Sequence, residues 1–473
     1  MATRLESLHE YIGQARWFGG KGRDFSVTGV TRLGEVGDPG DGHRVVVDLV
    51  ELTYDDTGER ELYQLPLVLY DEPEGRLDHA FVGWWQEGEG DDDWVHAYDA
   101  VHDRAAMARY LETFVRTPTS PVVEGSRQPD ESRHATLTFV RLEGHELDPD
   151  THGTLFSGEQ SNSSVLYGED AVLKVFRKIT PGENPDITTH RVLTEASSEH
   201  VAQLYGWIEA QTHDGILHLA MLQQFLRTAS DGWDLAVASV RDLFAEADLH
   251  AEEVGGDFAS EAARLGVALC EVHQQLGESF GTGTVRGSHV AELMNDRLDE
   301  AIKVVSELEE HADRLRGAFA ALGDLGDLPV QRIHGDLHLG QTLRTVLGWK
   351  LVDFEGEPAK PLAERLLPDS PWRDVAGMLR SFDYAPHAVA WSVPEEDRDV
   401  LEQRRHRAEE WAARNKRAFL EAYTDNDELT HEQGVLVAAY VADKTVYECV
   451  YEARNRPSWL PIPLSAIARI GTP

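Results

Sequence analysis

Carboxylate, amide and imidazole side chains gather in one short stretch, residues 331–358, Gln-Arg-Ile-His-Gly-Asp-Leu-His-Leu-Gly-Gln-Thr-Leu-Arg-Thr-Val-Leu-Gly-Trp-Lys-Leu-Val-Asp-Phe-Glu-Gly-Glu-Pro. Within it, Gln341 follows Asp336 by five positions and Asp353 follows Asp336 by seventeen. Phosphoryl transfer needs a carboxylate for the attacking hydroxyl, and oxygen ligands that hold Mg²⁺ against the phosphates. The stretch therefore predicts a catalytic base at Asp336 and metal ligands at Gln341 and Asp353.

The order of these residues is that of protein kinases, which place a metal-binding Asn five positions after the catalytic Asp and a second metal-binding Asp after a β-hairpin. Here residues 342–344 and 349–352 are predicted as the two strands of such a hairpin, with a turn near Leu347 and Gly348. The second strand would lead directly into the carboxylate that binds the metal.

A zinc-binding cluster is the alternative interpretation of His334, Asp336 and His338, because two histidines four positions apart can share a helix face. Gly335 and Gly340 argue against a helix at this point and so favour the kinase interpretation. His334 taken alone is equally well explained as a residue that only fixes the loop by hydrogen bonds.

A kinase also needs a cation for the nucleotide phosphates, and Lys174 stands alone among apolar residues in 172–176. A lone lysine in such a strand is an edge residue that faces water about as often as it is a phosphate ligand. The preceding loop can offer backbone N–H groups and hydroxyls to phosphates, although it contains a single glycine. From it we assign four residues to the nucleotide site: Gln160, Ser161, Asn162 and Ser163.

The helix predicted to start at Pro185 should supply the acidic partner of Lys174, because proline suits a first helical turn. Asp186 and Glu195 are both candidates, and Asp186 is counted with the nucleotide site. The end of a later strand, just before the chain becomes helical, is where a hinge would hold adenine by backbone hydrogen bonds. Gln224 and Leu226 are predicted there.

Sugars are bound by aromatic stacking and by hydrogen bonds from planar polar side chains, and the segment 443–459 is rich in both. At helical spacing, Tyr447, Tyr451 and Arg454 share one face, and Glu448 and Glu452 lie alongside. The alternative is that the tyrosines are core and the charges form a solvated stripe. We predict contact with an acceptor substrate, and add His338 to this group.

Three regions would position these residues. Residues 1–130 are predicted as a small α+β cap, with strands at 44–54 and 62–70 and a helix at 103–116. Residues 131–226 form a β-rich lobe, and residues 227–473 a helical lobe with long helices at 257–280, 289–321, 395–423 and 431–454, interrupted by a single short β segment around 334–353. The predicted fold class is α+β, a bilobal eukaryotic-protein-kinase-like fold with an N-terminal cap.

The chain of 473 residues carries 44 Lys and Arg against 84 Asp and Glu, a formal net charge of −40. Such a surface repels nucleic acid, and a nucleotide site on it needs a local cation or metal ion. No apolar run reaches the roughly 20 residues of a membrane-spanning helix, and residues 1–7 lack the apolar core of a secretory signal. With only two cysteines, Cys270 and Cys449, the expectation is a cytoplasmic protein without nucleic-acid or membrane partners.

Taken together, these motifs resemble the aminoglycoside phosphotransferase-like kinases, and more closely the maltokinases. The resemblance is carried by residues 15–21, 158–164, 172–186, 231–235, 334–341, 353–358, 374–382 and 443–457. It implies an N-terminal cap on a bilobal kinase that uses ATP and Mg²⁺. It also implies transfer of the γ-phosphate to the anomeric hydroxyl of maltose, giving maltose 1-phosphate for α-glucan (glycogen) synthesis from trehalose and maltose, and an association with trehalose synthase.

Two other functions stay open at this point. One is a kinase of another sugar, of an aminosugar such as glucosamine, or of an aminoglycoside, because a cationic acceptor would suit an acidic pocket. The other is a kinase-like regulator without catalysis, against which the intact Lys174, Asp336, Gln341 and Asp353 argue.

Overall fold

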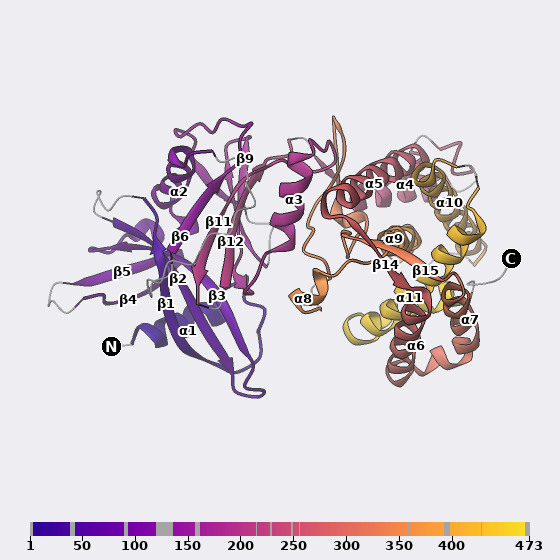
Figure 1. Cartoon of the computed structure of the whole chain (residues 1–473), viewed down its shortest axis with the longest axis horizontal. Coiled ribbons are helices and arrows are strands. Elements are labelled where there is room, and N and C mark those ends of the chain that lie inside the picture. Colours follow the sequence, from indigo (N-terminus) through magenta and orange to yellow (C-terminus); the bar gives the residue numbers. More distant parts are fainter. Residues whose placement is uncertain are drawn as a thin grey trace. The chain divides into compact units, whose positions relative to one another are not determined.

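The structure is a computed structural model that describes residues 3–37, 43–88, 93–119, 136–156, 161–213, 215–227, 229–246, 249–254, 256–357, 360–391, 398–426 and 428–468 (Figure 1). The chain divides into two compact units, one of residues 1–191 with 202–227 and the other of residues 192–201 with 228–473. The three-part division expected from the sequence stays a prediction.

The first unit opens with an antiparallel sheet in the strand order β1-β2-β3-β5-β4. Its helices and strands are α1 (Arg4–Gln14), β1 (Phe25–Glu35), β2 (His43–Tyr54), β3 (Arg60–Tyr70), η1 (Gly75–Ala80), β4 (Phe81–Gln86), β5 (Trp94–Asp99), η2 (Ala100–His102) and α2 (Arg104–Arg116). Successive side chains of a strand point to opposite faces. Accordingly, Val46 and Val50 pack in one core with Leu8 of α1, whereas Val45 and Val47 belong to a second core.

That second core is shared with another antiparallel sheet, in the order β6-β11-β12-β9-β8-β7. Its elements are β6 (Thr136–Arg141), β7 (Gly153–Phe156), β8 (Ser163–Tyr167), β9 (Ala171–Val175), β11 (Leu204–Thr212) and β12 (Gly215–Gln224), with α3 (Pro185–Glu195) between β9 and β11 in sequence. Immediately after β9, the chain joins the first sheet, where β10 (Lys178–Ile179) pairs with β3. The buried Gln64 amide of β3 also donates to Phe176 O and Leu219 O, each at 2.9 Å.

The second unit is mostly helical. Its helices are α4 (Gly232–Ala245), α5 (Ala259–Phe280), α6 (Gly287–Val304), η3 (Ser306–His311), α7 (Ala312–Gly323), η4 (Leu339–Gln341), α8 (Leu362–Arg365), α9 (Trp372–Trp391), α10 (Arg398–Thr424), α11 (His431–Asn455), η5 (Pro457–Trp459) and α12 (Pro461–Ile467). Its short strands are β13 (Ser230–Asp231), β14 (Thr282–Arg286), β15 (Asp327–Gln331), β16 (Thr342–Thr345) and β17 (Gly348–Leu351). One apolar core gathers α4, α5, α9 and α10 around β17, and another gathers α6, α7 and α11.

Two expectations for this unit were wrong in detail. The single helix expected over 289–321 is two helices, because Val305 leaves the helical conformation and Leu308 in the following turn is fully buried. The expected single β segment is joined by β13 and by a β14–β15 ribbon. The ribbon begins at Gly281, whose φ of 80° ends α5. Across the described ranges, no helix is long and apolar enough to cross a membrane.

Candidate active site

The loop that carries Asp336 is held by one face of α9. The backbone N–H groups of His334 and Gly335 donate to the two carboxylate oxygens of Asp374, at 2.7 and 2.8 Å. One turn on, a Cβ added at Gly377 would lie 2.3 Å from Leu337 O, so only glycine allows this approach. A further turn along, Ser381 Oγ accepts the N–H of Leu339 at 3.0 Å. Positions 374, 377 and 381 share a helix face, so α9 fixes the loop at three points.

The Asp374 carboxylate is 1% exposed and is further held by His273, whose Nε2 lies 3.0 Å from it. Burial alone would raise the pKa of Asp374, but the hydrogen bond and charge of His273 lower it, so the group stays ionised,. The other ring nitrogen of His273 lies 2.9 Å from the Tyr423 hydroxyl. If Nε2 donates to Asp374, Nδ1 accepts from that hydroxyl, and α5, α9 and α10 meet in one polar network.

His334 links this loop to the segment before Asp353. Its ring is buried, its Nε2 lies 3.0 Å from Val352 O, and it packs on Phe354 with 4.7 Å between ring centroids. His338 differs, because its Nδ1 accepts the N–H of Gly340 at 3.1 Å. Burial lowers the pKa of His338, and a neutral ring that accepts at Nδ1 carries its proton on Nε2,. Each imidazole therefore has a nitrogen committed to the backbone, which favours the loop-fixing role over a zinc cluster.

The predicted metal ligands come together at the open end of the hairpin β16–β17, with Gln341 just before β16 and Asp353 just after β17. Gln341 Nε2 donates to Asp353 Oδ2 at 3.2 Å. Asp353 has a φ of 68°, a left-handed conformation that is uncommon for residues other than glycine,. Lys350 of β17 anchors the hairpin by donating to Glu199 O at 2.7 Å. Carboxylate and amide oxygens are ligands that Mg²⁺ prefers, so the donor types at this point fit that cation.

Asp336 opens into a pocket of about 1040 Å³ in the second unit. The pocket takes in every acceptor residue predicted from the sequence: His338, Tyr447, Glu448, Tyr451, Glu452 and Arg454. The rings of Tyr447 and Tyr451 lie 6.3 Å apart and are 37% and 42% exposed, so they are not core residues. The pocket also contains residues that the sequence prediction did not assign: Asp231, Trp233, Asp234, Tyr384, Lys444, Asn455, Arg456 and Trp459.

The two glutamates of the pocket are held by arginines. Arg380 of α9, itself 1% exposed, donates to Glu448 Oε2 through Nε at 2.9 Å. Arg456 makes two bonds to Glu452, at 2.9 and 2.7 Å, and the Tyr384 hydroxyl donates to the same carboxylate at 3.2 Å. Burial raises the pKa of Glu448 although Arg380 opposes this. Sequence analysis missed Arg380 and Tyr384. The available signal was their four-residue spacing, which places both on one helix face.

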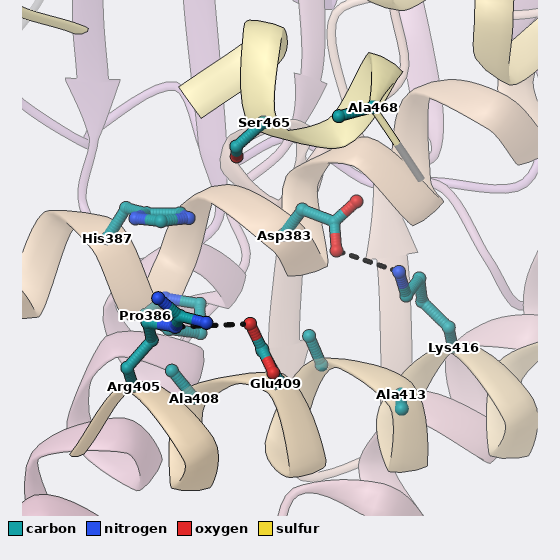
Figure 2. Close-up of a pocket in the computed structure, with 11 residues that line it drawn as sticks. Asp383, Pro386, His387, Arg405, Ala408, Glu409, Ala413, Lys416, Ser465 and Ala468 are labelled. Atoms are coloured by element: carbon teal, nitrogen blue, oxygen red, sulfur yellow. Dashed lines mark hydrogen bonds and ion pairs between the residues drawn. The ribbon is translucent and has the colours of Figure 1, made fainter. Parts of the chain in front are cut away.

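Arg380 also connects the pocket to a second one. Its Nη1 donates to Asp383 Oδ2 at 2.7 Å. Figure 2 shows that pocket, about 610 Å³ between α9, α10 and α12, where Lys416 Nζ donates to Asp383 Oδ1 at 2.7 Å. A row of alternating charges thus runs through Glu448, Arg380, Asp383 and Lys416. It fixes the Arg380 guanidinium through Asp383 as well as through Glu448.

Lys444 and Arg454, both on α11, differ in their charged neighbours. Lys444 Nζ lies 3.3 Å from Asp336 Oδ1 and 5.0 Å from the ring centroid of Tyr447. The exposed Arg454 side chain has no hydrogen bond or ion pair with any other residue that the structure describes. Behind Tyr447, Glu357 is buried and accepts from Arg373 at 3.1 Å, which ties the segment after Asp353 to α9.

The predicted nucleotide residues lie in the first unit. Lys174 of β9 donates to Asp186 of α3 at 3.1 Å, which selects Asp186 over Glu195 as its ion-pair partner. Burial would raise the pKa of Asp186, but the charges of Lys174 and His190 place it well below its usual range. Gln224 and Leu226 are half-buried at and just past the end of β12. Gln160 lies outside the described residues.

Ser161, Asn162 and Ser163 lead into β8 and are tied to the rest of the first unit by Arg177. This residue has no exposed surface. Its Nε donates to Ser163 Oγ at 2.8 Å and its N–H to Asn162 Oδ1 at 3.4 Å. Its Nη2 donates to Asp99 of β5 at 2.8 Å. One arginine therefore joins the first sheet to the end of the predicted phosphate loop, where β8 begins.

A model of the maltokinase N-terminal cap domain matches residues 11–103. The chain is 29% identical over 321 residues to the glucosamine kinase of Streptacidiphilus jiangxiensis, covering 64% of this chain and 70% of that protein. It is 26% identical over 364 residues to the glucosamine kinase of Mycolicibacterium smegmatis, covering 72% and 84%.

Among solved structures, a glucosamine kinase in complex with glucosamine, ADP and inorganic phosphate is similar over 98% of this chain and 99% of that chain, with a TM-score of 0.66 and 23% identity. Another crystal form of a glucosamine kinase gives a TM-score of 0.68 at 22% identity. With the cap match, this likeness confirms the predicted fold class, a β-rich N-terminal part with a cap and a helical C-terminal part.

The Asp374 anchor gives a testable prediction. Replacing Asp374 by Ala leaves two backbone amides, of His334 and Gly335, and the His273 ring without their acceptor, and should lower the free energy of unfolding by about 3–5 kcal/mol. Hydrogen exchange at the amides of His334 and Gly335 should accelerate. Tyr423→Phe removes only the outer hydroxyl of the network and should cost about 0.5–1.5 kcal/mol. Unchanged exchange at both amides in the folded Asp374→Ala variant would contradict the anchor.

Proposed function

We propose that the protein is an ATP-dependent sugar kinase that phosphorylates maltose at its anomeric hydroxyl, giving maltose 1-phosphate. The observation that carries this proposal is that Asp336 faces the same pocket as a wall of tyrosines, arginines and carboxylates, while Gln341 and Asp353 meet behind the adjoining hairpin. The similarity to glucosamine kinases and the maltokinase cap match support the reaction class.

In the proposed reaction, Asp336 accepts the proton of the attacking sugar hydroxyl. A bond forms between that oxygen and the γ-phosphorus as the bond from the γ-phosphorus to the ADP oxygen breaks, and ADP leaves with the electron pair. Asp374 keeps the Asp336 loop in place through backbone hydrogen bonds. His338 is suited to donate from Nε2 to a sugar oxygen, because its Nδ1 is already occupied.

Asp353 and Gln341 are the residues that would hold Mg²⁺, with a carboxylate and an amide oxygen. The bound cation would neutralise charge on the nucleotide phosphates. The 3.2 Å hydrogen bond from Gln341 Nε2 to Asp353 Oδ2 holds the two side chains next to each other.

The ATP phosphates are assigned to Lys174, with Asp186 as its orienting partner, and to the loop residues Ser161, Asn162 and Ser163. Gln160 belongs to the same proposal. For the adenine, the N–H groups of Gln224 and Phe225 are already donated to Gln203 O and Asp170 O, each at 2.8 Å. Leu226 has no such bond among the described residues, and its backbone groups are therefore the better candidates for adenine recognition.

The length of the pocket supports a disaccharide. Its lining follows α11 from Lys444 to Asn455, about 16 Å at the rise of an α-helix, and continues to Trp459. This exceeds the length of one pyranose ring. Tyr384 and Trp459 are stacked at 6.2 Å and lie beyond the Tyr447–Tyr451 pair, which provides aromatic surface for a second ring.

Glucosamine or another aminosugar is the second candidate. The names of the relatives favour it, and so does Asp234, an exposed pocket carboxylate that pairs with no cation among the described residues. The unpaired Arg454 guanidinium favours a neutral sugar instead. We include in the maltose proposal its place in α-glucan synthesis, an association with trehalose synthase and a cytoplasmic location.

The proposed function is tested by identifying the product. After incubation with ATP and Mg²⁺ and each of maltose, glucose and glucosamine, mass spectrometry should find phosphorylated maltose, and NMR should place the phosphate on the anomeric carbon. Asp336→Asn should fold and lose about 10²–10⁴-fold in kcat. A product formed from glucosamine alone would establish the aminosugar alternative, and a folded Asn variant with wild-type kcat would remove Asp336 from its role.

The metal assignment predicts that Asp353→Ala weakens nucleotide binding only when Mg²⁺ is present. The ATP affinity of the variant should resemble that of the wild type measured without Mg²⁺. Asp299→Ala, which removes a carboxylate from the exposed face of α6, is the matched control and should keep the full metal dependence. If Asp353→Ala kept the wild-type dependence of ATP affinity on Mg²⁺, Asp353 would not be a metal ligand.

The acceptor pocket predicts the effect of Arg454→Ala. Loss of a charged hydrogen-bond donor should cost about 1.5–3 kcal/mol, or roughly 10- to 150-fold in kcat/KM for the sugar. The KM for ATP should change little. Arg417→Ala, on an exposed part of α10, is the control. If Arg454→Ala raised the KM of ATP and spared that of the sugar, the pocket would not be the acceptor site.

A further inference from the structure

We propose that Lys444 is a catalytic residue that binds the transferring phosphoryl group, an inference that rests on the proposed kinase function. Its Nζ lies 3.3 Å from Asp336 Oδ1, and both side chains are about one-quarter exposed and line the pocket. The ion pair is therefore neither sealed in the core nor free in bulk solvent, and a substrate can reach both partners.

The geometry of the reaction places the phosphoryl group within reach of Lys444. The attacking hydroxyl must lie about 2.6–3.2 Å from the base that accepts its proton, and about 3–3.5 Å from the phosphorus. An ammonium that already contacts the same carboxylate is then one hydrogen bond away from the attacking oxygen or from an equatorial phosphoryl oxygen. The proton of the sugar hydroxyl goes to Asp336, and Lys444 supplies positive charge and hydrogen bonds to the phosphoryl oxygens.

The other cations of the pocket are poorly placed for this task. Arg456 is committed to Glu452 by two hydrogen bonds. Arg454 is ten residues further along α11, about 15 Å by helical rise. Among the pocket-lining cations that the structure describes, Lys444 is thus the one beside the base. In a chain of net charge −40, a local cation is needed where three phosphoryl oxygens carry the charge of the transition state,.

The alternative is that Lys444 has a purely structural role. Partly exposed ion pairs contribute little to stability, so Lys444 could serve only to orient Asp336 through the hydrogen bond, or to pack its stem on the Tyr447 ring. An orienting donor would not need a charge, and a packing residue would affect sugar binding or stability rather than the chemical step. An uncharged hydrogen-bond donor at position 444 can therefore replace a lysine that only orients Asp336, but not one that stabilises the charge of the phosphoryl group.

The test measures single-turnover phosphoryl transfer and, separately, hydrolysis of ATP by water without sugar, in Lys444→Met and Lys444→Gln. Gln keeps a donor for Asp336 but lacks the charge. We expect both rates to fall about 10²–10³-fold in both variants, with the affinities for ATP-Mg²⁺ and sugar within about threefold of wild type. Ethylammonium should restore part of the rate in Lys444→Ala. Lys303→Met, on the exposed face of α6, should match the wild type.

Several results would overturn the proposal. One is a wild-type transfer rate in Lys444→Gln, which would assign the residue to positioning Asp336. Another is a raised KM for sugar with unchanged ATP hydrolysis, which would assign it to acceptor binding. Since hydrolysis needs no sugar, and transfer can be followed with whichever sugar the enzyme accepts, failure of the maltose assignment and failure of this inference are separate outcomes.

Discussion

The buried carboxylate of Asp374 is the interaction on which the position of the Asp336 loop depends. It accepts two successive backbone N–H groups of the loop before Asp336, and no water can replace it at 1% exposure. The same helix carries Gly377 and Ser381 toward the loop, and Arg380 and Tyr384 toward the acceptor pocket. One helix, α9, therefore positions both the Asp336 loop and part of the pocket wall, and the proposed reaction requires this kind of positioning.

Three carboxylates of the pocket are each paired with a cation, in spite of the chain's net charge of −40. Glu448 is matched by Arg380, Glu452 by Arg456 and Asp336 by Lys444. An isolated buried carboxylate would be costly, whereas a carboxylate bonded to a guanidinium can stay charged and keep its remaining lone pairs for a ligand. The local field that a ligand meets in the pocket therefore depends on these ion pairs as well as on the net charge of the chain.

The sequence could predict which site residues are neighbours when they are close in the chain, but not when they are far apart in it. The hairpin between Gln341 and Asp353 follows from strand pattern and turn residues, and the shared face of Tyr447, Tyr451 and Arg454 follows from the helical period. Lys444 beside Asp336 and Arg380 beside Glu448 are contacts over many residues, set by how helices pack. No periodicity encodes such contacts. The break between α6 and α7 was missed for a similar reason, since burial of Leu308 decides it.

The pairing of β10 with β3 means that the cap is not a detachable module. Val45 and Val68 of the first sheet share a core with Leu173 and Leu219 of the second, and the Gln64 amide satisfies carbonyls at Phe176 and Leu219. A shortened chain without the first sheet would bare this apolar face and leave β10 as an unpaired edge, the usual template for edge-to-edge aggregation. Transplanting the cap onto another protein would accordingly require the complementary face to be carried with it.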